Sequence, residues 1–221
     1  MKQIINKYLN LRTHKYYFPL LIAGIILFGA SAIFNYAANN YTALHASGRV
    51  TDLFLDNLPV KNVDEIFYEG TLMLELFVIL LALHEPKRIP FMLKSTALFI
   101  FVRSFFMILT HFSPPINETL THPINLIQRL TAGSGYDLFF SGHTGFPFLM
   151  ALLFWNNKYL RSIFIASSIV FGAAVLFGHL HYSIDVFSAF FITFGIYHIA
   201  MKIFKRDFDF FQDTVKTKAI A

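Results

Sequence analysis

The chain has 221 residues, of which 56% are hydrophobic and 14% are charged. Soluble domains carry about 25% charged residues, and a soluble protein this apolar could not cover its surface with polar groups, so an integral membrane protein is indicated. The absence of cysteine excludes disulfide and thiolate chemistry. The net charge of +5 does not indicate nucleic-acid binding, because the basic residues lie between long apolar runs, as at the ends of membrane helices.

A helix that crosses a membrane needs about 20 mostly apolar residues. Six segments of the chain meet or approach this length. In chain order they are Tyr17–Tyr36, Phe67–Leu83, Phe91–Thr110, Thr144–Trp155, Ile163–Leu180 and Tyr182–Phe204. We therefore predict an all-α fold, a bundle of six transmembrane helices that forms one domain over residues 1–221. The fourth segment is short unless it begins near Leu138. The first is longer than a signal peptide's core of about 7–15 residues, so we expect it to be a retained helix.

Lysine and arginine in the short loops predict the orientation of these helices. Fourteen lie in the two tails, residues 1–16 and 205–221, at Lys202 just before the second tail, and around the loops after the second and fourth segments. The opposite side has three, Arg49, Lys61 and Arg129, so both termini are expected in the cytoplasm. Two longer connections, residues 50–68 and 113–140, then lie on the non-cytoplasmic face, where long loops commonly build a site.

The sixth segment opens with a histidine and an aspartate, His181 and Asp185, four residues apart and hence on one face of a helix. A carboxylate in that position can accept a hydrogen bond from one imidazole nitrogen, which fixes the tautomer and leaves the other nitrogen free as a nucleophile. The same spacing also fits a structural histidine at a helix end, where the aspartate only accepts a hydrogen bond from the ring and neither residue takes part in catalysis. Ionisable residues in membrane segments are rare and indicate function by default.

The fourth segment opens with Ser141, Gly142 and His143 on the same predicted face. Ser141 can cap the helix, Gly142 lets a ligand approach the backbone, and the free N–H groups of a helix N-terminus favour phosphate. His143 beside that phosphate could protonate a departing oxygen. The tripeptide alone also fits an ordinary capped helix, but its pairing with His181 and Asp185 on one face is more specific.

FSGHT (Phe140 to Thr144) and HYSIDV (His181 to Val186) resemble the last two motifs of the type 2 phosphatidic acid phosphatase (PAP2) superfamily. The likeness is greatest to its sphingomyelin-synthase-like branch, whose motifs read roughly GDYLFSGHT and HYTIDV, and it covers residues 50–200 or so. The further matches to that branch are Asp137, four residues before Ser141, then Arg103, Thr110 and Pro115, and more loosely Asp56 to Pro59 and Glu69.

The resemblance implies a two-step phosphoryl transfer without a metal or other cofactor. His181 would attack phosphorus and form a phosphohistidine, Asp185 would orient it, and His143 would act as acid and then as base. Ser141, Gly142, Arg103, Asp137, Tyr182 and Glu69 are the expected substrate contacts. The substrates implied are a phospholipid and a lipid alcohol, with the phospho-head-group moving to ceramide or diacylglycerol, or to water in a hydrolase.

The chain departs from the wider superfamily in its phosphate-binding cations. The first motif of Lys, six residues and Arg-Pro does not occur, and Val175 stands where an Arg precedes the second histidine. Arg103 is the best replacement, although it lies eight residues before His111, about 12 Å along a helix. Either the site reaches well into the membrane, or Arg103 supports the structure.

Two other hypotheses remain open. A metal-dependent membrane hydrolase could use His179 with His181, joined by His111 and His122, since two imidazoles and a carboxylate can bind zinc. His179 and His181 point to different sides of a helix, however. A lipid-binding scaffold with a decayed site is the non-enzymatic alternative, and the intact catalytic set argues against it.

Overall fold

The computed structural model describes residues 2–12, 14–115 and 135–219, and the regular structure in these ranges is helical. The elements are α1 (Lys2–Arg12), α2 (Tyr17–His45), the π-helical η1 (Glu65–Gly70), α3 (Thr71–His84), the short η2 (Pro86–Arg88), α4 (Ile89–Leu109), α6 (Gly142–Leu153), α7 (Lys158–Phe177), α8 (Ser183–Ile203) and α9 (Lys205–Ala219). The all-α class is therefore confirmed for this part of the chain. Arg129 and His122, which entered the predictions above, lie outside it.

Among the described residues, five helical stretches are long and apolar enough to cross a membrane. They are Tyr17–His45, Glu65–His84, Pro86–Leu109, Lys158–Phe177 and Ser183–Ile203. These helices indicate an integral membrane protein. The fourth predicted span corresponds to α6, whose 12 residues extend only about 18 Å against a hydrocarbon core of about 30 Å, so the count of six crossings stays a prediction.

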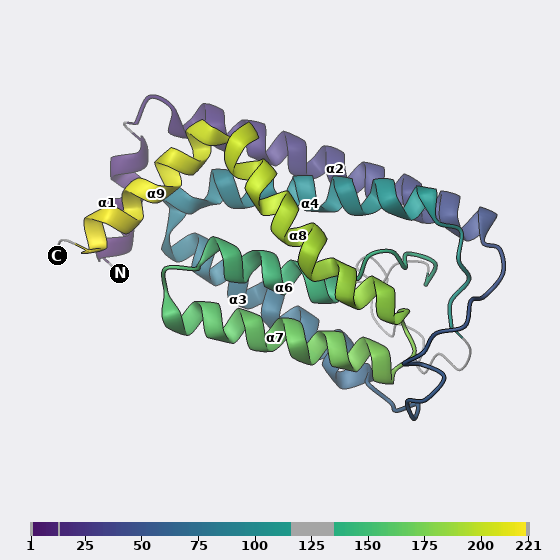
Figure 1. The fold of residues 1–221 in the computed structure, drawn as a ribbon. Coiled ribbons are helices and arrows are strands. Elements are labelled where there is room, and N and C mark those ends of the chain that lie inside the picture. The colour runs from purple at the N-terminus through teal and green to yellow at the C-terminus, as the bar shows by residue number, and fades with distance from the viewer. Residues whose placement is uncertain (1, 13, 116–134, 220–221) are drawn as a thin grey trace.

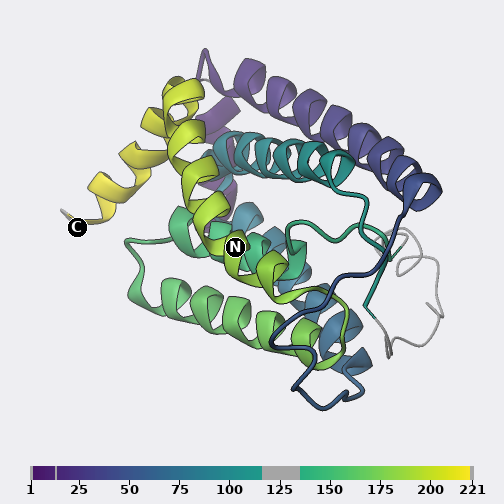
Figure 2. The same cartoon turned by 45° about the vertical axis from the view of Figure 1, so that its right-hand side comes forward.

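The helices form two groups that α8 joins (Figure 1). In one group α2 lies along α4, and in the other α6 packs against α7 with α3 nearby. Helix α8 crosses diagonally from one group to the other, in contact with both α6 and α4 (Figure 2). Both chain termini lie at one end of the bundle, and α6 and α8 begin at the opposite end.

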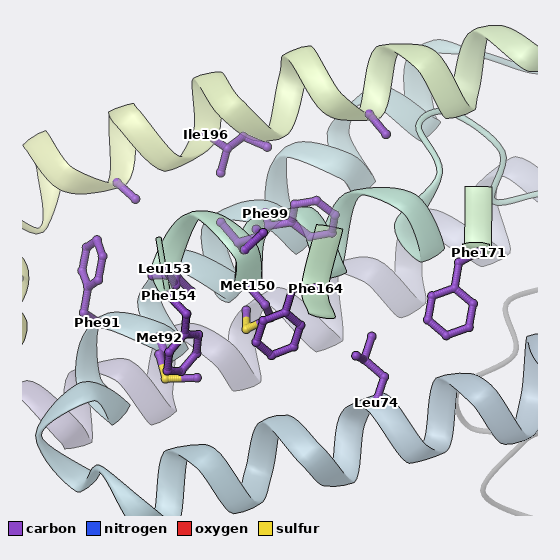
Figure 3. Packing of buried hydrophobic residues seen from close by; sticks show 14 of the residues in the cluster. Leu74, Phe91, Met92, Phe99, Met150, Leu153, Phe154, Phe164, Phe171 and Ile196 are labelled. Carbon is purple, nitrogen blue, oxygen red and sulfur yellow. The ribbon is translucent and has the colours of Figure 1, made fainter. Parts of the chain in front are cut away.

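Helix α6 forms the centre of the core although it is the shortest apolar helix described. Leu149, Met150 and Ala151 are completely buried, and side chains from α3, α4, α7 and α8 converge on it (Figure 3). Two glycines allow this close packing. A Cβ on Gly145 would meet the neighbouring helices at under 3 Å, and one on Gly172 of α7 would lie 3.3 Å from Thr144 Oγ1.

The helical tails are attached at the end of the bundle that holds both termini. Lys94 of α4 and Asp207 of α9 form a buried ion pair, with 2.6 Å between Nζ and Oδ1. The Arg88 guanidinium lies over the rings of Phe154 and Phe211, 5.0 and 4.8 Å from their centroids. The segments expected as cytoplasmic tails therefore include helices, and α9 is packed on the bundle.

Gly145→Ala tests the packing of α6. The new Cβ would lie 2.8 Å from the Phe99 ring and 2.9 Å from Thr193 Oγ1, so α6 must shift, and we expect a loss of about 1–3 kcal/mol in the free energy of unfolding. Gly195→Ala on α8 is the matched control, because a Cβ there meets nothing within 4 Å and alanine favours a helix by up to about 1 kcal/mol. Thermal unfolding in detergent measures both variants, and equal midpoints would contradict this packing.

Candidate active site

The start of α6 presents free backbone donors. The buried Ser141 side chain caps the helix, because its Oγ accepts a hydrogen bond from Thr144 N at 3.3 Å. The next two N–H groups, of Gly142 and His143, belong to the first helical turn and have no partner within the helix. Such N–H groups, together with the helix dipole, make this end suited to an anion.

The start of α8 is organised around the completely buried Asp185. Its Oδ2 accepts a hydrogen bond from Tyr182 N at 3.0 Å and lies 3.3 Å from His181 Nδ1. A carboxylate at this nitrogen favours the tautomer that carries its proton on Nδ1 and its lone pair on Nε2. The spacing of four residues thus produces the predicted pair, and the same carboxylate also caps the helix.

Backbone and hydroxyl contacts bring these two helix starts together. Ser141 N donates to the backbone oxygen of Asp185 at 3.0 Å, which joins the α6 start to the first turn of α8. Ser168 of α7 donates to the backbone oxygen of Thr144 at 2.6 Å. All three predicted catalytic residues, His143, His181 and Asp185, therefore lie in one region.

Arg103 reaches this region from the middle of α4. Its Nε donates to the Phe140 backbone oxygen at 2.7 Å, and its Nη2 donates to Asp137, both to the backbone oxygen and to Oδ2, the latter at 3.0 Å. An ideal Cβ on Gly142 would lie 3.3 Å from Arg103 Nε. The guanidinium thus lies directly against the start of α6, next to the expected phosphate position.

The position and the contacts of Arg103 bear on both alternatives for its role. It lies six residues before Leu109, the end of α4, which puts the start of α6 about 9 Å below that end. It also supports the structure, because most of its five N–H donors are engaged with residues 137–140 and with Met107 Sδ. Arg103 thus satisfies backbone oxygens of the irregular segment that precedes α6.

The remaining predicted contacts lie at the edges of this region. The Tyr182 hydroxyl donates to the Ser113 backbone oxygen at 2.9 Å and accepts from Val50 N at 3.4 Å, so it ties two loops to α8. Glu69 lies in η1 with an exposed side chain that lines a groove against α7. Between that groove and the site stand two rings: Phe67, 4.1 Å from the His143 ring, and Phe171, 6.5 Å from it.

Asp52 is a positioning residue that the sequence reasoning missed. The buried carboxylate accepts from Ser183 N, the first residue of α8, at 2.6 Å and from Phe54 N and Leu55 N in its own loop. Burial alone would raise its pKa, but the hydrogen bonds, that from Ser183 first among them, outweigh burial and lower the pKa below the ordinary value. An aspartate in a loop is a typical turn or cap residue, but its partner is 131 residues away, which no local pattern reveals.

The metal alternative would draw on His179, His181 and His111, together with His122, which lies outside the described residues. His179 has a left-handed backbone, with φ of 53°, and its Nε2 lies 3.3 Å from the backbone oxygen of Leu58. His111 lies beside the rings of Tyr41 and His45 near the end of α2. In the part of the chain that the structure covers, no three histidine or acidic side chains are grouped to hold a metal ion.

Asp52→Asn tests the anchoring of α8 and has a defined pH dependence. Because the pKa of Asp52 is lowered by folding, its stabilisation is full above the unfolded value of about 3.9 and is lost as the pH falls through the lower folded value. We expect Asp52→Asn to lower the free energy of unfolding by about 1 kcal/mol at neutral pH, and we expect this difference to shrink as the pH approaches 3. Thermal unfolding from about pH 7 to 3 measures it, with Asp56→Asn, an exposed residue of the same loop, as the control. A pH-independent difference would contradict this role.

Comparison with known families agrees with the two motifs. Residues 136–202 match the model described as PAP2 superfamily C-terminal. The matched range, less than a third of the chain, contains Asp137, the α6 start and the α8 start, whereas Arg103 and Glu69 lie outside it. No curated protein and no solved structure matches the chain. The part of the chain that carries His143, His181 and Asp185 is thus similar to the C-terminal region of the PAP2 superfamily.

Proposed function

We propose that this protein is an integral membrane lipid phosphotransferase that acts through a phosphohistidine on His181. The match of residues 136–202 supports a lipid enzyme of the phosphatase or phosphotransferase type, and the long apolar helices support its membrane location. One observation carries the proposal: Asp185 orients His181 through its side chain and holds the His143-bearing helix start through its backbone oxygen.

In the first step His181 Nε2 attacks phosphorus, a P–N bond forms, and the P–O bond to the leaving lipid alcohol breaks. Asp185 stabilises the positive charge that develops on the imidazole. Protonated His143 gives its proton to the departing oxygen. Splitting one displacement into two in this way is the usual gain of a covalent intermediate.

In the second step neutral His143 takes the proton of an incoming hydroxyl. The hydroxyl oxygen attacks phosphorus, and the P–N bond returns its electron pair to His181. A lipid alcohol as acceptor gives head-group transfer, and water gives hydrolysis. The same residues serve both outcomes, so the acceptor defines the reaction.

The phosphate oxygens are held at the α6 start. The N–H groups of Gly142 and His143 and the adjacent Arg103 guanidinium supply donors and positive charge without a cofactor. Ser141 acts by capping the helix, and Tyr182 by fixing the loops around α8. Asp137 pairs with Arg103 while a quarter of its side chain stays exposed, so it could also meet a cationic head group.

The substrates that we propose are phosphodiester lipids, with transfer of the phospho-head-group from a glycerophospholipid to ceramide or diacylglycerol, as in the sphingomyelin-synthase-like branch. We place the site on the non-cytoplasmic face, with six crossings and both termini in the cytoplasm. The charge bias supports this orientation, and so does the position of both termini at the end of the bundle away from the site. A recessed site explains how α6 completes a crossing, since about 18 Å of helix and 9 Å of recess approach the hydrocarbon thickness.

The proposal is tested by incubating purified protein with phospholipids labelled in the phosphate, with and without ceramide or diacylglycerol. We expect a new labelled phospholipid and a transient acid-labile, base-stable label on the protein. His181→Ala should abolish the label and reduce turnover at least about a thousandfold, and His143→Ala should reduce turnover about 10²–10⁴-fold. His198→Ala, a half-buried position near the other end of α8, is the control.

The products separate the alternatives. Free phosphate or a free phospho-head-group in place of a new lipid identifies a hydrolase with the same intermediate. Loss of turnover on chelation, restored by zinc, identifies the metal-dependent hydrolase. Turnover that is unchanged in His181→Ala contradicts the proposal and favours a scaffold.

A further inference from the structure

An open groove runs along the outside of the bundle between the η1–α3 stretch and α7. Its volume is about 550 Å³, within the range of small-ligand sites. Its walls include Ile66, Glu69 and Met73 on one side and Ile163, Ala166 and Val170 on the other. Apart from the carboxylates of η1, this lining is almost entirely apolar.

The groove lies between two helical stretches, Glu65–His84 and Lys158–Phe177, that are long and apolar enough to cross a membrane. Met73 and Val170 are 71% and 51% exposed, so their apolar surface is left uncovered by the protein. From Phe171 to Ile163 the α7 wall covers eight residues, about 12 Å, close to half the thickness of a hydrocarbon core of about 30 Å. These dimensions match an extended stretch of acyl chain.

One side chain connects this groove to the site. Phe171 lines the groove, and its ring lies 6.5 Å from the His143 ring on the other side. It stands at one end of the core cluster (Figure 3). An ideal Cβ on Gly70 would lie 3.0 Å from Phe171, so the absence of a side chain on this glycine allows η1 to pack closely against the ring. The π-helical form of η1 is itself a conformation frequent at functional sites.

The groove is polar at one end and apolar at the other, as a phospholipid is. The carboxylates of Glu65 and Glu69 lie at the η1 end, and the lining side chains farther along, such as Met73 and Ile163, are apolar apart from Ser167. A molecule with a cationic head group and a hydrocarbon chain would therefore be complementary in charge at one end and in hydrophobicity at the other.

We infer that this groove binds one hydrocarbon chain of the phosphorylated lipid, with the chain along α7 and the head group passing Phe171 towards His143. The inference rests on the proposed function and deepens it, because it assigns the chain-binding site of the substrate. A tryptophan at Ala166 would fill the groove without touching the catalytic residues.

The first test compares Ala166→Trp with Ile169→Trp, an exposed position on α7 outside the groove. Turnover of dioleoyl and dihexanoyl forms of phosphatidylcholine and phosphatidylethanolamine is measured for each variant. We expect the ratio of long-chain to short-chain turnover to fall about tenfold in Ala166→Trp, which corresponds to about 1.4 kcal/mol of lost van der Waals packing between the chain and the groove. Ile169→Trp should keep the wild-type ratio, and equal ratios in both variants would overturn the inference.

The second test does not need turnover. Phosphatidylcholine with a photoreactive diazirine in its acyl chain is incorporated with the protein into vesicles, and the cross-linked peptides are identified by mass spectrometry. We expect the label to concentrate on residues 66–73 and 163–170 and to decrease there in Ala166→Trp. An even distribution over all lipid-facing helices would refute the groove as a site. If the wild-type protein turns over no phospholipid, the proposed function fails, and the cross-linking still decides whether the groove binds a chain.

Discussion

The Arg103 guanidinium, held against the start of α6, is the interaction on which the rest of the site depends. A charge on a membrane helix costs about 2.5–3.5 kcal/mol even on the lower scales, whereas each hydrogen bond to a charged group returns about 1.5–3 kcal/mol. Arg103 bonds to the Phe140 backbone oxygen and to both the carboxylate and the backbone oxygen of Asp137. These bonds offset its burial, and they satisfy backbone oxygens of the loop that precedes α6.

The position of Arg103 along α4 determines where the other parts of the site lie. Arg103 lies six residues before the end of α4, so α6 begins below that end, and its first residue, Gly142, lies beside the guanidinium. Asp185 then joins this start to α8 through its backbone oxygen while its carboxylate orients His181. Asp52 holds the same turn of α8 from the loop side. Three buried polar residues thus position two imidazoles that lie 38 residues apart in the chain.

Much of this could be predicted from the sequence, because membrane helices and helix starts are local features. Apolar runs gave the helices to within a few residues, except that α2 continues to His45 and the tails contain α1 and α9. The spacing of His181 and Asp185 and the Ser141 cap were likewise readable. The depth of Arg103 and the role of Asp52 were not, because each depends on a partner from a distant segment. Glu69 shows the same limit, since only the fold reveals that it faces a groove on α7.

The central claim is that His181 and His143 meet over one phosphorus atom. An experimental structure with orthovanadate, which mimics a phosphoryl group in transfer, tests it most directly. We predict vanadium bonded to His181 Nε2, with its oxygens within hydrogen-bond reach of His143 and of the N–H groups at the α6 start. Vanadate bound elsewhere, or the two rings too far apart for one vanadate to bridge, would contradict it.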